Sequence, residues 1–153
     1  MAENIKEIKL PDKIFRGNSF FLSVYDDWKD KTIYTIAGPV SDEMQHNILI
    51  TKDDENGFDN AFEYADWQID SLETSLPACI LLKRGEKKLD CGLQAYEAVF
   101  RWIPTDEKKI YQHQIYVFHN KTGYTLTASF SKRTKKIYGP MVQRIMLSFN
   151  PLT

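Results

Sequence analysis

The sequence predicts an α+β domain, an antiparallel sheet with packed helices. Strand-like runs rich in aromatic and β-branched residues make up most of the chain. Two segments with helical periodicity, at about 58–75 and at 139–149, interrupt these runs. Turn signals such as the KTG at 121–123 separate neighbouring strand runs. The resulting order of three strands, a helix, four strands and a helix is typical of a sheet covered by helices.

The N-terminal part begins with a polar segment, 1–17, which predicts a loosely held arm ending at Gly17. The rest of the chain, residues 18–153, is predicted to form a single domain, because a length of 153 residues is within the usual size of one domain. The strands predicted ahead of the first helix are 18–24, 31–39 and 45–52. We expect Gly38-Pro39 to close the second of these strands.

The first helix has the strongest periodicity in the chain. Apolar residues recur at spacings of three and four, which places them on one stripe. These residues are Phe58, Phe62, Ala65, Ile69, Leu72 and Leu76. Pro77 cannot continue a helix and therefore ends it.

The second half predicts strands at 78–84, 91–103, 110–118 and 124–131, followed by a helix at 139–149. Pro140 suits the first turn of that helix. Its buried face is expected to consist of Val142, Ile145, Met146 and Phe149. The basic run at 131–136, SKRTKK, is interpreted as a solvated loop rather than a nucleic-acid patch, because the run is short and the net charge is −1.

The strand 110–118 raises a question about its two faces. One face carries Ile110, Gln112, Gln114, Tyr116 and Phe118, and the other carries Tyr111, His113, Ile115, Val117 and His119. Two amides thus alternate with apolar residues on a single face. The sequence alone does not tell which face meets the core or what the glutamines bind.

Composition and motifs favour a binding protein over an enzyme. No cysteine pair, histidine pair, phosphate loop or nucleophile elbow has the spacing of a catalytic or metal site, so no cofactor is expected. Cys79 and Cys91 fit a reduced compartment as two small buried hydrophobes, and a hairpin would allow them to face each other. The polar N-terminus and the absence of a long apolar run predict a cytoplasmic protein without a membrane anchor.

Three segments together resemble the DcrB-related family, and within it the Eag chaperones of bacterial type VI secretion. The segments are YDDWKDKTIYTI, ITKDD with FEYADWQIDSLETSLP, and YEAVFRWIPTDEKKIYQHQIYVF. The resemblance runs over about residues 18–149. It implies a Mog1/PsbP-like fold, a homodimer, and a function as a chaperone. Such a chaperone shields the N-terminal transmembrane helices of a PAAR or Rhs effector before loading on the VgrG spike.

The same resemblance implies a groove for the effector helices. The positions that match it are Ile33, Thr35, Gln68, Leu72, Leu76, Ile110 and Gln114. Thr35 stands where an aliphatic residue is usual, and Leu72 stands where a small residue is common. Two readings remain open. In one, both glutamines offer amide groups to the polar atoms of a bound helix, and in the other they are solvated or satisfy backbone groups while the leucines are plain core.

Two other functions compete with the chaperone. One is a Mog1/PsbP-like adaptor that binds a folded soluble protein through a polar face. The other is an enzyme of unknown type, which no reactive constellation supports. A neighbouring gene for an effector with N-terminal apolar helices would favour the chaperone over the adaptor.

Overall fold

A computed structural model describes residues 8–54, 56–105 and 108–152 of the chain. The chain divides into two compact units, one ending at Thr32 and the other running from Ile33 to the C-terminus. The smaller unit contains an antiparallel hairpin of β1 (Lys13–Arg16) and β2 (Phe21–Val24). β1 lies within the segment predicted as an arm. Gly17 forms the turn after it, where a Cβ would lie 2.6 Å from the Phe20 ring.

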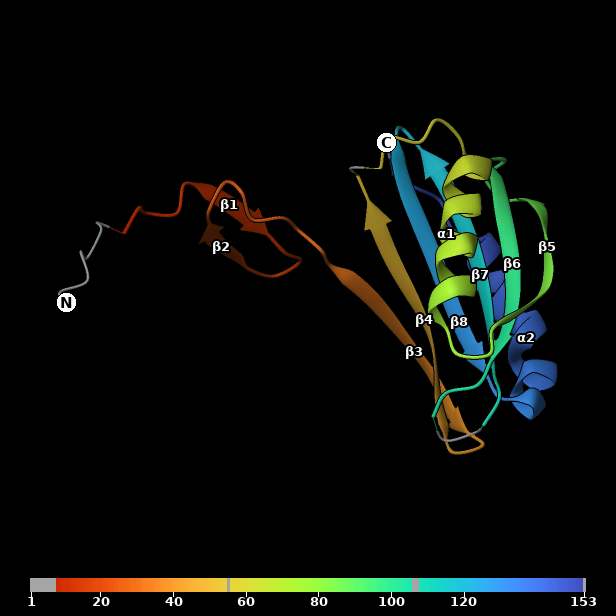
Figure 1. The fold of residues 1–153 in the computed structure, drawn as a ribbon. Coiled ribbons are helices and arrows are strands. Elements are labelled where there is room, and N and C mark those ends of the chain that lie inside the picture. The colour runs from red at the N-terminus through yellow and green to blue at the C-terminus, as the bar shows by residue number, and fades with distance from the viewer. Residues whose placement is uncertain (1–7, 55, 106–107, 153) are drawn as a thin grey trace, which may run out of the picture. The chain divides into compact units, whose positions relative to one another are not determined.

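The larger unit is a six-stranded antiparallel sheet with one helix on each face (Figure 1). Its strands lie in the order β3-β4-β8-β7-β6-β5. The elements in chain order are β3 (Ile33–Ser41), β4 (Met44–Asp53), α1 (Ala61–Ser75), β5 (Ile80–Lys88), β6 (Gln94–Trp102), β7 (Ile110–His119), β8 (Thr122–Phe130) and α2 (Lys132–Leu147). The predicted α+β class is therefore confirmed.

Two hairpins close through two-residue turns in which both central residues have positive φ. Asp42 and Glu43, with φ of 55° and 58°, join β3 to β4. Asn120 and Lys121, with φ of 49° and 62°, join β7 to β8, one residue earlier than predicted. This left-handed pair of conformations matches the twist of the flanking strands.

The edge strand β3 does not end at Gly38-Pro39, so the predicted end is wrong. It continues to Ser41, with an irregularity in its pairing to β4 between Ala37 and Val40. Pro39 lies at this irregularity on an edge strand, where the missing N–H group costs the sheet little.

The helix α1 begins later than predicted because Asn60 caps it. The Asn60 side chain accepts a hydrogen bond from the Glu63 backbone N at 2.9 Å. Tyr64 then enters the core in place of Phe62, which is exposed. The buried residues on this side of the sheet are Tyr64, Ala65, Ile69, Ala98, Phe100 and Tyr116.

The helix α2 begins at Lys132, seven residues before the predicted start at 139. The run SKRTKK therefore forms the first turns of a helix, and its interpretation as a loop is wrong. Ser131 and Thr134 form a reciprocal cap, with Oγ1 of Thr134 accepting from the Ser131 N at 2.9 Å. This cap starts the helix, which then passes through Pro140 at the loss of one hydrogen bond.

The buried face of α2 only partly matches the prediction. Met146 is fully buried, and Val142 and Phe149 pack against the core, but Ile145 is half exposed. The core on this side consists of Ile48, Leu89, Ala95, Ile115, Val117, Leu126, Ala128, Phe130 and Met146. The face of β7 that carries Ile115 and Val117 therefore meets α2, and the face that carries Gln114 and Tyr116 meets the α1 layer.

Candidate functional site

The two helices cover different parts of the sheet. α1 packs on β6 and β7, and α2 packs on β7 and β8 from the other side. On the α1 side, β4 and β3 are consequently not covered by the helix, which reaches Gly123 and Thr125 of β8 through Tyr64 (Figure 1). The side chains there follow from the pairing registers, since directly paired residues share a face.

We call this surface the open face. Its residues are Ile33 and Thr35 of β3, Leu49 and Thr51 of β4, and Thr127 of β8. One row runs straight across the sheet, because Thr35 pairs with Leu49, Leu49 with Thr127, and Thr127 with Gln114. Thr35 and Gln114 are thus in one row but three strand spacings apart, about 14 Å.

The ridge of α1 that borders the open face carries Tyr64, Gln68 and Leu72 at spacings of four. The Tyr64 hydroxyl lies 2.6 Å from Thr125 Oγ1 on β8, which fixes the direction in which this ridge points. Burial raises the pKa of Tyr64, and side-chain hydrogen bonds with Thr125 and Gln68 oppose that rise. Gln68 therefore lies on the side of α1 toward β8, and Leu72 packs against the α1-side core.

Gln114 is buried, and its amide is engaged within the protein. Its Nε2 donates to Thr127 Oγ1 at 3.0 Å, and its Oε1 accepts a hydrogen bond from the Tyr116 hydroxyl. Burial raises the pKa of Tyr116, so this phenol stays protonated and remains a donor. The amide thus positions Thr127 of the open face, and one Nε2 proton and the Oε1 atom are used within the protein.

The remaining predicted residues lie near the end of α1. Leu76 is the C-terminal cap of that helix and is half-buried. The carbonyl of Pro77 accepts from the Ile103 N at 3.0 Å, which brings the helix end beside the end of β6. Ile110 pairs with Trp102 at that same end of the sheet. Leu76 and Ile110 are therefore placed away from Ile33 and Thr35, which belong to the edge strand.

Sequence reasoning missed three members of the open face, namely Leu49, Thr51 and Thr127. All three follow the period-two alternation of their strands. Alternation along a strand shows which residues share a face but not which face points toward α1. That assignment depends on the register between β4 and β8. The sequence also contains a signal for a second feature, a cluster of charged side chains. Glu97 lies within the apolar strand YEAVF, and a carboxylate buried there needs charged or hydrogen-bonding partners.

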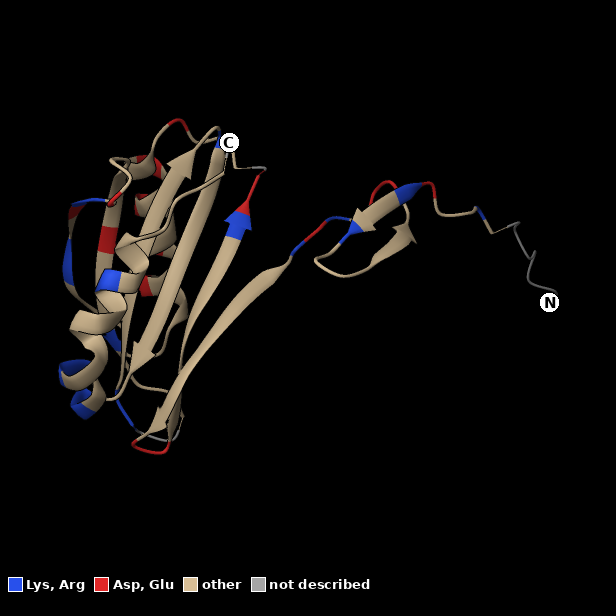
Figure 2. Cartoon of the chain, turned by 180° about the vertical axis from the view of Figure 1, so that it is seen from behind, with Lys and Arg blue, Asp and Glu red and all other residues tan. Residues whose placement is uncertain are grey.

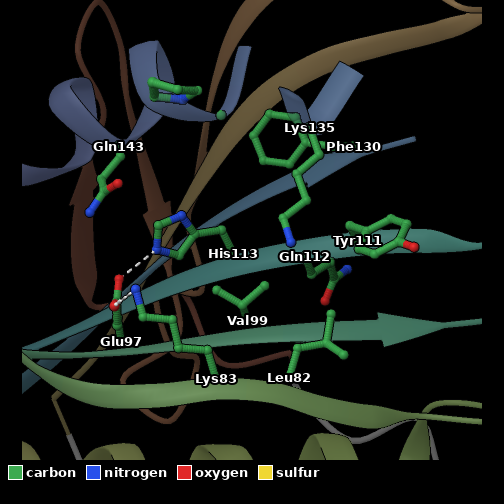
Figure 3. Close-up of a pocket in the computed structure, with 12 residues that line it drawn as sticks. Leu82, Lys83, Glu97, Val99, Tyr111, Gln112, His113, Phe130, Lys135 and Gln143 are labelled. Carbon is green, nitrogen blue, oxygen red and sulfur yellow. Dashed lines mark hydrogen bonds and ion pairs between the residues drawn. The ribbon is translucent and has the colours of Figure 1, made fainter. Parts of the chain in front are cut away.

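That second feature is a charge cluster on the α2 side, centred on Glu97 (Figure 3). The Glu97 carboxylate is buried and lies 3.1 Å from Lys83 Nζ, 3.6 Å from Lys87 Nζ and 3.0 Å from His113 Nε2. Burial raises the pKa of Glu97, but hydrogen bonds from Lys83 and His113 outweigh it and hold the pKa below its usual range. Burial lowers the pKa of His113. The carboxylate is therefore ionised while the imidazole is neutral at pH 7.

Comparison with known proteins shows the family. The DcrB family model matches residues 21–146. The chain belongs to the DcrB family. No curated protein matches this DcrB-family chain.

One crystal structure similar to this DcrB-family chain is that of a protein of unknown function from Pseudomonas aeruginosa. The two share 19% sequence identity and superpose with a TM-score of 0.75. The match covers 92% of this chain and 97% of the other. This likeness shows that the two proteins share a fold.

The cysteines of this DcrB-family chain do not face each other. Cys79 precedes β5 and packs against the α1-side core, whereas Cys91 is exposed in the turn before β6, with its Sγ 3.7 Å from the Phe149 carbonyl. They lie at opposite ends of the β5–β6 hairpin and so do not face each other, and the expectation that Cys91 is buried is wrong. In the described part of the chain, no group of three His, Cys, Asp or Glu could hold a metal, and no helix is long and apolar enough to cross a membrane.

Proposed function

We propose that this protein is a cytoplasmic chaperone that covers the N-terminal transmembrane helices of a type VI secretion effector of the PAAR or Rhs type. It would hold them until the effector is loaded on the VgrG spike, without catalysis and without a cofactor. The observation that supports this proposal most is the open face, where apolar and hydroxyl side chains lie beside α1 with no helix over them. Membership in the DcrB family is compatible with the proposal.

The apolar part of the open face suits a membrane helix in water. Ile33 is 59% exposed on the edge strand, and Leu49 is half-buried next to it. A transmembrane helix in water exposes apolar area at a cost of roughly 25 cal/mol per Å². Covering that area with Ile33 and Leu49 would remove part of this cost.

The polar part of the open face suits the same ligand. Membrane helices pack through small residues and carry Ser and Thr groups that need hydrogen-bond partners. Thr127 already accepts from Gln114 Nε2, and that bond leaves its own O–H proton available as a donor. Thr35 and Thr51 add two hydroxyls on the same face. The threonine at position 35 thus adds a hydrogen-bonding group where an aliphatic residue would add area.

We further propose that the chaperone acts as a homodimer. A helix of about 20 residues is about 30 Å long, which is comparable to the nine residues of β3 at strand rise. One open face covers only one side of such a helix, so two copies would cover more of it. Light scattering of the purified chain at micromolar concentration should give the mass of two chains. A monomer only would contradict this arrangement.

Two isoleucines of β3 give a matched pair of variants to test the binding face. Ile33 is 59% exposed on the open face, and Ile36 is 58% exposed on the opposite face of the same strand. Ile33→Asp should abolish co-purification with the N-terminal apolar segment of a PAAR or Rhs effector, because an unpaired carboxylate against an apolar helix costs several kcal/mol. Ile36→Asp should leave co-purification intact.

Both variants should keep the circular dichroism spectrum of the unchanged protein, since both side chains are exposed. Loss of binding in Ile36→Asp alone would show that the effector segment binds on the α2 side of the sheet. Full binding by both variants would show that the open face is not the surface that binds the effector segment.

A further inference from the structure

A second surface lies on the opposite side of the sheet, where α2 leaves β5 and β6 uncovered. A cavity of about 380 Å³ opens there. Its apolar wall is formed by Leu82, Val99, Tyr111 and Phe130, and its polar side chains include Lys83, Glu97, His113, Lys135 and Gln143. Figure 3 shows these side chains converging from β5, β6, β7, the end of β8 and α2. A volume of this size is within the range of small-molecule sites, about 300–1,000 Å³.

The cavity has an excess of positive charge. Glu97 is the acidic side chain of the lining, and it is shared by Lys83 and Lys87. His113 donates its Nε2 proton to the same carboxylate. One negative charge therefore serves two ammonium groups. The Lys83 ammonium carries three protons, so its contact with Glu97 leaves donors for a ligand.

Lys135 adds a second cation to the lining, from the first turns of α2. Its Nζ lies 5.0 Å from the centroid of the Tyr111 ring, on the wall of the cavity. Among the residues that the structure describes, no carboxylate lies within ion-pair distance of Lys135. Figure 2 shows that most of the basic residues of α2 lie near one end of that helix.

We propose that this cavity binds a small organic carboxylate with an aromatic or short aliphatic body. The carboxylate would lie between Lys135 and Lys83, and the body would pack on Val99, Leu82 and Phe130. Lysine ammonium groups bind carboxylates through charge-assisted hydrogen bonds, which are stronger than neutral ones. This site is on the other face of the sheet from the open face and is independent of the proposed chaperone function.

The test is a titration of the full ¹⁵N-labelled chain with benzoate, followed by NMR. We expect saturable shifts of amides around Val99, His113 and Lys135, with a Kd of about 1 mM for so small a ligand. Benzyl alcohol, which has the same ring and no charge, should bind at least tenfold more weakly. This comparison needs no variant and therefore does not depend on the folding of one.

A matched pair on α2 tests the role of Lys135. Lys135→Gln should raise the Kd for benzoate about tenfold, because it removes one charge-assisted bond. Lys136→Gln removes the same charge from an exposed neighbour and should leave the Kd unchanged. The proposal is overturned by equal binding of benzoate and benzyl alcohol, by equal effects of the two variants, or by shifts that do not saturate by about 20 mM benzoate.

Discussion

A buried network around His46 ties three elements together and yields a sharp prediction for Thr134. The Nδ1 atom of His46 lies 3.2 Å from the Pro39 carbonyl of β3, and Nε2 lies 2.8 Å from Thr134 Oγ1 of α2. A carbonyl only accepts, so Nδ1 carries the proton. In the neutral imidazole Nε2 therefore accepts from the Thr134 hydroxyl. The same oxygen accepts from the Ser131 N and completes the helix cap.

Thr134→Val keeps the shape of the side chain and removes its hydroxyl. Thr134 and His46 are both buried, so water does not readily replace the lost partner. Stranding the buried imidazole nitrogen costs about 1–3 kcal/mol. Loss of the reciprocal cap bond from the Ser131 N adds about 1 kcal/mol. We therefore expect the free energy of unfolding to fall by about 2–4 kcal/mol.

The measurement is urea unfolding followed by circular dichroism at pH 7.5, where a shift of the midpoint at constant slope reports the change in stability. Thr134→Ser is the control, because it keeps the hydroxyl and loses one methyl, with an expected cost of about 1 kcal/mol. If valine cost no more than serine, the hydroxyl would not hold the three elements together.

Three further predictions concern the core, the thiols and the charge cluster. Ile115→Asp places a carboxylate at a fully buried position, so circular dichroism should show an unfolded chain, in contrast to Ile33→Asp. Replacing both Cys79 and Cys91 by Ala should cost about 1 kcal/mol of packing at Cys79 and leave co-purification with the effector segment unchanged; a folded variant without binding would contradict this. Burial lowers the pKa of His113, so the unfolded chain binds more protons below about pH 6.5 and stability should fall there by up to about 1.4 kcal/mol per pH unit. Urea midpoints at pH 7.5 and 5.5 should differ less in His113→Gln, and an unchanged difference would refute this assignment.

The sequence carried enough information to predict the sheet and the main helix, because their patterns are local. The stripe of α1 and the alternation in β7 arise from residues a few positions apart. The start of α2 was missed because Lys132, Arg133 and Lys136 are charged and Pro140 suggested a first turn. The Ser131–Thr134 cap outweighs both signals, and Thr134 is buried by a contact to His46, which lies 88 residues away in the chain.

The site depends on information that no local pattern contains. Thr35, Leu49 and Thr127 form one row only because two strand registers align them. Gln114 lies on the α1 side of β7, and its amide is engaged by Thr127 and Tyr116. Whether a buried glutamine is free or bonded depends on neighbours across the sheet, and these are set by the tertiary structure.

The edge strand β3 exposes apolar side chains, and this exposure relates the fold to the proposed function. The central strand β7 is covered by α1 on one face and by α2 on the other, and Ile115, Tyr116 and Val117 are fully buried there. β3 is covered by neither helix and exposes Ile33, Tyr34, Ile36 and Val40. Edge strands are usually protected from pairing by charges, yet β3 contains no charged residue and has only the irregularity at Pro39. An apolar, uncharged edge of this kind is expected to be covered in the functional state, and a bound apolar helix together with a second copy of the chain would cover it.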